Sequence, residues 1–194
     1  MGLTIMILGL VLFLGVHALT TRRELRARLV ASVGEGGYKV GYALVSLAGL
    51  VLIAKGFAGY RAAGQIEIWH PPAALKYVTE ALMLPAVILV VASYIRGRIY
   101  ATLKHPMLAG VKLWAASHLI ANGDLGSIIL FGSFLGWAVF DRISLKSRAD
   151  SGAPPIPVGG VSNDVIAVVA GVLVYLALGF VFHPVVIGVA VFGV

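Results

Sequence analysis

Apolar residues in this chain are gathered into long, nearly uncharged stretches, and this clustering limits what the chain can fold into. We read six such stretches, at 2–20, 38–58, 77–95, 107–122, 125–141 and 165–182, followed by an apolar tail to Val194. A helix needs roughly 20 apolar residues to cross a bilayer. The chain is 60% hydrophobic and 12% charged, whereas soluble domains carry about 25% charged residues. The sequence therefore predicts an integral membrane protein.

The predicted fold is all-α: a bundle of about six transmembrane helices that forms a single transmembrane domain over 1–194. The first stretch has no basic residues before it and no small-residue cleavage site after it, so we expect it to remain as a helix. The longest polar stretch, 142–164, is rich in proline and glycine and predicts a flexible loop. The segment 60–76 contains Trp69 and two prolines and predicts a loop at the membrane interface.

Glycine is abundant in the predicted helices. Small residues let membrane helices approach one another closely. We interpret the glycines at near-helical spacing in the second and last stretches as packing positions, namely Gly41, Gly49, Gly56, Gly171 and Gly179. They predict close helix packing and carry no chemistry.

The positive charge lies in alternate connections between the predicted helices. The formal net charge is +7, and the basic residues concentrate in 21–37, 96–104 and 142–164. These connections fall on one side of a six-helix bundle, which the positive-inside rule makes cytoplasmic. The lipid bilayer thus explains the charge, and no motif indicates a nucleic-acid partner. The absence of cysteine excludes disulfides, thiolate metal sites and a cysteine nucleophile.

The fourth stretch carries the most informative polar residues. A stripe of side chains repeats there at spacings of three and four residues, which places them on one helix face that we expect to look inward: Met107, Val111, Trp114, His118 and Asn122. Ionisable groups inside the hydrocarbon usually mark function, and His17 lies in the first stretch in the same way. Inward histidines on two helices are the usual means of holding haem iron in a membrane bundle. The second ring nitrogen of such a ligand needs a hydrogen-bond partner, which Asn122, one turn from His118, would supply or orient.

A simpler interpretation exists for each histidine. An intramembrane histidine can serve only as a hydrogen-bonding group between helices, and this alternative applies to His17 and His118. His70, His105 and His183 each precede a proline at a predicted helix boundary. For these three, an interfacial or helix-capping role is the default interpretation, because proline suits the first turn of a helix.

The chain resembles the NnrU family of bacterial membrane proteins over most of its length. The resemblance is most specific from His105 to Trp137, in the run His105-Pro-Met-Leu-Ala-Gly-Val-Lys-Leu-Trp-Ala-Ala-Ser-His118-Leu-Ile-Ala-Asn122-Gly-Asp and the following Phe131-Gly-Ser-Phe-Leu-Gly-Trp137. The run Phe13-Leu-Gly-Val-His17 fits as well. The resemblance implies a protein of the bacterial inner (cytoplasmic) membrane that is linked to denitrification, through the expression or activity of nitrite and nitric oxide reductases.

The NnrU family is related to plant 15-cis-zeta-carotene isomerase, which binds haem b in the membrane. That relation implies haem b as cofactor, His17 and His118 as the positions of its axial ligands, and His105 as a further matching histidine. It also implies redox or isomerase-like chemistry on a lipophilic molecule, or the handling of a nitrogen oxide. The plant enzyme has a ligand-exchange cysteine three positions before the residue that matches His118, where this chain has Ala115. That departure argues against carotenoid isomerisation by ligand exchange here.

Depth along the helices leaves two ligand pairs open. Counted from the cytoplasmic face at 1.5 Å per residue, His118 lies roughly 20 Å deep and His17 roughly 7 Å. Two axial ligands need similar depths. Either the first helix sits deeper or the fourth begins outside the bilayer, and otherwise His17 with His105 is the better-matched pair.

Two other functions compete with a haem protein. One is a non-enzymatic assembly or transport factor for nitrogen-oxide reductases, in which the histidines are structural or relay protons. The other is a methyltransferase, because the run from Lys104 to Gly110 also resembles the Arg-His-Pro-x-Tyr-x-Gly segment of isoprenylcysteine methyltransferases. Those enzymes have a later acidic and arginine-containing motif, and here only Asp164 stands near the last stretch. We rank that alternative last.

Overall fold

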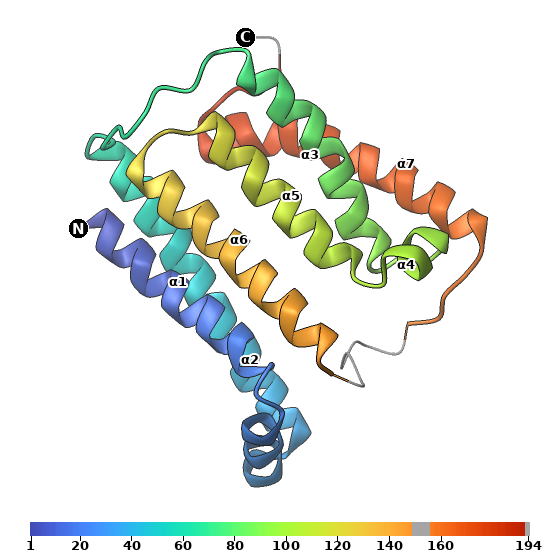
Figure 1. Cartoon of the computed structure of the whole chain (residues 1–194). Helices are drawn as coiled ribbons and strands as arrows, with labels where there is room; N and C mark the ends of the chain where they lie inside the picture. The colour runs from blue at the N-terminus through green and yellow to red at the C-terminus, as the bar shows by residue number, and fades with distance from the viewer. Residues whose placement is uncertain (149–155, 193–194) are drawn as a thin grey trace. The chain divides into compact units, whose positions relative to one another are not determined.

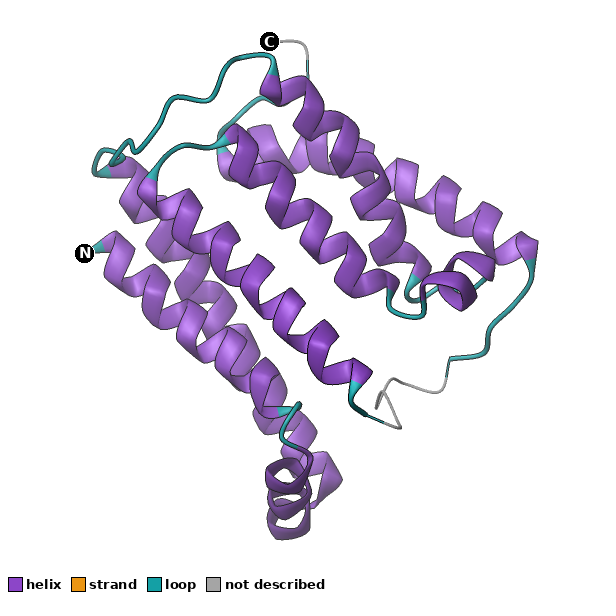
Figure 2. Ribbon diagram, in the orientation of Figure 1, coloured by secondary structure: helices purple, strands orange, loops and turns teal. Residues whose placement is uncertain are grey.

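The computed structural model describes residues 1–148 and 156–192, and helices make up most of them (Figures 1 and 2). The elements are α1 (Gly2–Leu19), α2 (Arg23–Ala62), α3 (Leu75–Ala92), α4 (Arg98–Leu103), α5 (Pro106–Ala121), α6 (Leu125–Lys146), α7 (Val161–Ala177) and the π-helix η1 (Leu178–Ile187). The described residues contain no β-strand beyond one isolated bridge, between Glu67 and Asp124. The predicted all-α fold is confirmed.

Each of the six predicted spans coincides with a helix of the structure. Five helices are long and apolar enough to cross a membrane: α1, α2, α3, α6 and the continuous α7–η1 segment. The fourth predicted span, α5, has 16 residues, which corresponds to about 24 Å of helix. It is shorter than the hydrocarbon core of a typical bilayer, about 30 Å. The chain is a multi-pass membrane protein.

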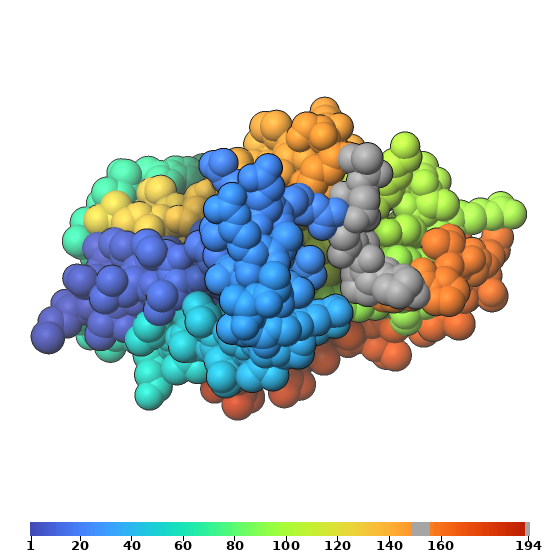
Figure 3. Space-filling view, turned by 90° about the horizontal axis from the view of Figure 1, so that it is seen from below, coloured from blue at the N-terminus to red at the C-terminus, as the bar shows by residue number. Residues whose placement is uncertain are grey.

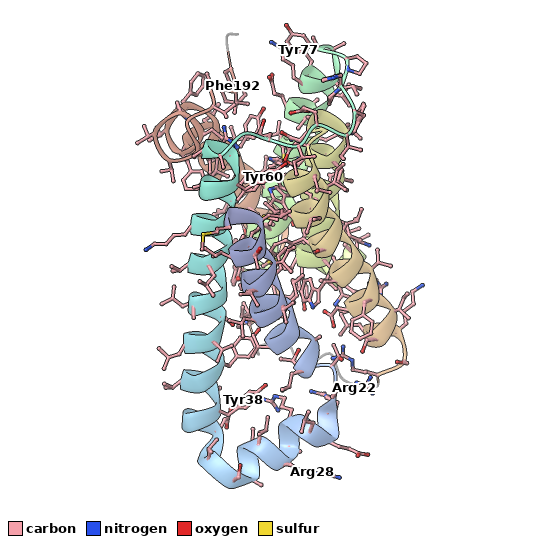
Figure 4. All side chains as sticks on the ribbon, turned by 90° about the vertical axis from the view of Figure 1, so that its left-hand side faces the viewer. Arg22, Arg28, Tyr38, Tyr60, Tyr77 and Phe192 are labelled. Carbon is pink, nitrogen blue, oxygen red and sulfur yellow. The ribbon has the colours of Figure 1, made fainter. Side chains whose placement is uncertain are left out.

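The connection predicted at 21–37 is helical instead of a loop, which corrects the sequence interpretation. α2 begins at Arg23 and runs for 40 residues, with a break at Gly34, where φ is 75° and ψ is 163°. Glycine adopts such a positive φ at no steric cost, so it ends one helix and starts the next. Figure 4 shows the Arg28 segment before the break turned away from the rest of α2, and Figure 3 shows the same segment (mid-blue) from below.

The helices group into two compact units. Unit 1 comprises Met1–Trp69 and Gly123–Ser147, and unit 2 comprises His70–Asn122 and Arg148–Val194. The single transmembrane domain proposed from the sequence stays a prediction. The polar loop predicted at 142–164 is partly helical, because α6 ends at Lys146 and α7 begins at Val161. Its residues 149–155 lie outside the described part of the chain.

In unit 1, α1 packs antiparallel against α2 along glycines, with α6 beside α1 (Figure 1). A methyl group on Gly9 would lie 2.6 Å from the backbone nitrogen of Ile53, and one on Gly49 would lie 2.8 Å from that of Phe13. Gly56 meets the backbone of Met6 in the same way. The packing interpretation is confirmed for Gly49 and Gly56. Gly41 has open space around it.

The connection between α2 and α3 is fastened to the start of α6. The Ile66 carbonyl accepts from the Leu125 N–H at 2.8 Å, and the Gly123 carbonyl accepts from the Ile68 N–H at 2.9 Å. Asp124 is 4% exposed and caps α6, because its Oδ1 accepts from the Ser127 N–H at 2.9 Å. An aspartate at this position satisfies one of the free N–H groups of the first turn.

In unit 2, α3 contacts both α5 and α7. The Thr79 hydroxyl of α3 donates to the Ser117 carbonyl of α5 at 2.8 Å, and the Tyr175 hydroxyl of α7 donates to the Glu80 carbonyl at 3.1 Å. Gly110 lets α5 approach α3 closely, because a methyl group there would lie 2.7 Å from the Ala86 carbonyl oxygen. Backbone acceptors thus receive the polar side chains between these helices, as a hydrocarbon surrounding requires.

The contact between α1 and α2 gives a direct test of the fold. We expect Gly9→Ala to lower the free energy of unfolding by about 1–3 kcal/mol, because the added methyl group meets backbone atoms that cannot rotate away. Gly15→Ala is the matched control on the same helix, since nothing lies within 4 Å of a methyl group there. The measurement is the thermal unfolding midpoint of both variants in detergent. Equal midpoints would refute the close approach of the two helices.

Candidate functional site

His17 lies near the end of α1, among aromatic rings of unit 1. Its Nδ1 donates to the Phe13 carbonyl at 2.6 Å, and the Phe13 ring stacks on the imidazole with ring centres 4.2 Å apart. Tyr42 of α2 and Trp137 of α6 also pack against His17. Their ring centres lie 5.2 Å and 5.6 Å from that of the imidazole. His17 therefore faces the interior of unit 1, between three helices.

The sequence reasoning missed these aromatic partners. Tyr38 and Tyr42 are one turn apart on α2, and Phe134 and Trp137 are one turn apart on α6. That helical spacing was visible, and it is a signal for a shared face. What the sequence could not give was the register that brings the two faces against His17.

His118 lies in the last turn of α5, in unit 2, and is half-buried. Its Nδ1 donates to the Trp114 carbonyl at 2.8 Å, and the Trp114 ring centre lies 5.6 Å from its own. The predicted stripe of α5 is half-buried along its length, whereas the most buried residues of this helix lie on neighbouring positions such as Ala115 and Ser117.

Asn122 does not play the part assigned to it from the sequence. Its side-chain amide donates to the backbone carbonyl of His118 at 2.8 Å and so closes the end of α5. The ring nitrogen of His118 is satisfied instead by Trp114, one turn earlier. The reason is local geometry: in a helix the carbonyl four residues back is within reach of the imidazole, whereas Asn122 follows His118 and meets its carbonyl.

The structure brings His183 beside His118. The two ring centres are 6.4 Å apart and the ring planes differ by 22°. The Nδ1 of His183 donates to the Leu178 carbonyl at 2.9 Å, five residues earlier. This pairing, between α5 and η1, was not predicted.

His183 is not at a helix boundary, which corrects the sequence interpretation. It lies inside η1, and Pro184 follows it within the same helix. Proline lacks the N–H that an α-helix needs and collides with the preceding turn. The wider π-helical turn accommodates it, and such turns occur often at functional sites.

The remaining two histidines are His105 and His70. His105 is the residue before α5, and Pro106 occupies the first turn as predicted. Its side chain makes no capping hydrogen bond, so of the two roles expected for His105 only the interfacial one stays a prediction. His118 follows it by 13 positions in the chain, which is roughly 20 Å along a helix. His70 is exposed in the connection between α2 and α3.

A buried arginine organises the other polar part of unit 2. Arg96 is 7% exposed, and its guanidinium lies 4.2 Å from the centre of the Tyr100 ring. Asp164 of α7 accepts hydrogen bonds from the backbone N–H groups of Arg98 and Ile99, both at 3.0 Å. The carboxylate thus caps the start of α4. Asp164, the acidic residue considered above for a methyltransferase site, therefore has a structural role here.

Within the described residues, no three histidine, aspartate or glutamate side chains gather into a metal-binding group. What the structure offers is a pair of imidazoles in unit 2 and a single aromatic-lined imidazole in unit 1. In His17, His118 and His183, Nδ1 donates to a carbonyl. Because a carbonyl can only accept, the proton sits on Nδ1, and Nε2 carries the lone pair that binds a metal.

Comparison with known proteins identifies the family. The model of the family described as NnrU protein matches residues 5–191, nearly the whole chain. No curated protein sequence and no solved structure matches the chain. The family resemblance expected from the residues between His105 and Trp137 is confirmed, and the chain belongs to the NnrU family.

Proposed function

We propose that this protein is a haem b-binding protein of the bacterial cytoplasmic membrane that serves denitrification. In this proposal it acts on a lipophilic molecule or handles a nitrogen oxide at the haem, and the basic connections face the cytoplasm. Membership of the NnrU family supports the link to denitrification. The excess of basic residues in 21–37 and 96–104 supports the orientation.

One observation carries the haem proposal: the spacing and tautomers of His118 and His183. Metal–imidazole bonds are about 2 Å long and a ring centre lies about 1 Å behind its nitrogen, so imidazoles on opposite sides of one metal have centres about 6 Å apart. The two rings are 6.4 Å apart. Both carry their proton on Nδ1, held by a backbone carbonyl, which is the usual support of a metal-binding histidine.

The residues of unit 2 would hold the group from both sides. The carbonyls of Trp114 and Leu178 orient the two imidazoles, and the Phe182 ring lies edge-on to His183, with ring centres 6.0 Å apart. When bound, haem supplies an iron that changes oxidation state and exchanges ligands. The pairings of His17 with His118 or with His105, expected from the sequence, stay predictions.

A second candidate function is the non-enzymatic assembly or transport factor for nitrogen-oxide reductases. The hydrogen bonds that His17, His118 and His183 make to backbone carbonyls are compatible with it. In that case the carbonyl-bonded histidines serve only to satisfy polar groups within the bilayer. The two functions differ in one property, the presence of a bound pigment.

The haem proposal predicts a coloured protein. Full-length protein purified in detergent from haem-sufficient cells should show a Soret band, and the reduced protein should show sharp α and β bands. His118→Ala should lower the haem bound per polypeptide by at least about tenfold, because a ligand is lost. His70→Ala is the control, since His70 is exposed in a connection. A colourless wild-type protein that also fails to bind added haemin would overturn the proposal and favour the assembly factor.

The partner of His118 is decided by two further variants. If His183 is the second axial ligand, His183→Ala should convert the low-spin spectrum to a high-spin one or lose the haem, while His17→Ala should leave the spectrum unchanged. The absorption spectra of the two variants, in oxidised and reduced forms, make this measurement. The opposite pattern would establish His17 as the ligand, as the sequence resemblance implied.

A further inference from the structure

Three buried polar atoms in unit 1 make no hydrogen bond of good geometry within the described residues: the Tyr38 hydroxyl, the Ser46 hydroxyl, which lies beside Tyr42, and Nε1 of Trp137. A buried donor without an acceptor costs about 1–3 kcal/mol, and no water is at hand within the hydrocarbon to reduce this. Three such atoms in one small helical unit indicate that a polar ligand supplies their hydrogen-bond partners.

The register of α1 and α2 places Tyr42 and Ser46 beside His17, and Tyr38 lies one turn beyond Tyr42. Gly9 meets Ile53 and Gly49 meets Phe13, so one further turn along this antiparallel pair brings His17 level with residue 45. Tyr42 and Ser46 lie on either side of residue 45 along α2. Tyr38, Tyr42 and Ser46 follow one another at four-residue spacing and share one face of α2. Figure 4 shows Tyr38 on the side of α2 that carries α1.

Aromatic rings from three helices pack around His17. The Phe13 ring stacks on His17 with an angle of 29° between the planes, and Trp137 meets it edge-on at 89°. Tyr42 lies at 55° to the imidazole. Aromatic side chains such as these suit a ligand with a flat ring, because aromatic groups pack by offset stacking and by edge-to-face contact.

The polar groups indicate a neutral ligand with both acceptor and donor oxygens. Trp137 can only donate, and the hydroxyls of Tyr38 and Ser46 can donate to a carbonyl oxygen. The Nε2 of His17 carries a lone pair, because Nδ1 donates to Phe13, and it can accept from a ring hydroxyl.

Apolar side chains on the outside of α2, at the level of His17, can contact the hydrophobic tail of a ligand. The outward side of α2 at the same level is apolar and exposed, with Val40 59%, Leu44 62% and Leu47 58% accessible. Exposed apolar side chains on a membrane helix are the surface that lipid tails contact. The hydrophobic tail of a ligand bound in unit 1 therefore has apolar surface to contact on the outside of α2.

We propose that unit 1 contains a binding site for the ring of a membrane quinol or quinone, formed by His17, Tyr38, Tyr42, Ser46 and Trp137. The donors Trp137, Tyr38 and Ser46 bind the carbonyl oxygens of the quinone, and His17 accepts from the hydroxyl of the quinol. The aromatic side chains hold the ring flat. This site assigns His17 to an organic ligand instead of iron, and no step of it depends on the haem proposal.

The test is the binding of ubiquinone-1 to the full-length protein in detergent, followed by quenching of tryptophan fluorescence. The proposal predicts saturable quenching. Trp137→Phe should remove most of the quenching, and Tyr38→Phe and Ser46→Ala should each weaken binding about fivefold, the effect of one lost hydrogen bond. Trp69→Phe and Tyr77→Phe are the matched controls, because both side chains are exposed and lie elsewhere. Unfolding midpoints of all variants establish that they are folded.

Several outcomes would overturn this site. They are an absence of saturable quenching by the wild-type protein, quenching that Trp137→Phe leaves intact, and displacement of ubiquinone-1 by equimolar phosphatidylglycerol, which would indicate a phospholipid headgroup. Loss of haem from His17→Ala would also overturn it, because His17 would then belong to iron. A protein that binds ubiquinone-1 as predicted and carries no haem would keep this site and overturn the proposed function alone.

Discussion

A hydrogen bond from a histidine ring to a backbone carbonyl underlies the whole functional account. Inside a bilayer every polar group needs a partner within the protein, and the carbonyl one turn earlier is the nearest acceptor for an imidazole on a helix. His17, His118 and His183 all use it, through Nδ1. The bond fixes the tautomer and the direction of each ring, and it leaves Nε2 as the nitrogen that meets a ligand. What each histidine binds then depends on what stands opposite its Nε2.

The surroundings of these imidazoles differ. In unit 2 a second imidazole stands at 6.4 Å from the first, a spacing suited to a metal between them. In unit 1 aromatic rings and buried hydroxyls surround a single imidazole, a surround suited to a neutral organic ring. Glycines make the unit 1 arrangement possible, because they let α1 and α2 approach until Gly49 touches the backbone of Phe13. The close packing of α1 and α2 therefore sets the surroundings of His17.

The sequence predicted the helices well and their polar contacts less well. Runs such as 2–20 and 125–141 are mostly apolar, and hydrophobicity alone places such helices in a bilayer. The helix before Gly34 was missed because its arginines read as a loop, although they also favour a helix. His183 was taken as a boundary residue because Pro184 usually begins a helix, and only the π-helical turn allows that proline inside. The partner of an imidazole depends on register between helices, which a single sequence does not specify.

The most direct test of the central claim is electron paramagnetic resonance of the oxidised, full-length protein with ¹⁵N-labelled histidine. The account predicts a low-spin ferric signal with hyperfine coupling to nitrogens of two histidines, and the coupling of one of them should vanish when position 183 no longer carries an imidazole. A high-spin signal without histidine coupling, or a signal indifferent to residue 183, would contradict the claim that His118 and His183 face one another across a metal.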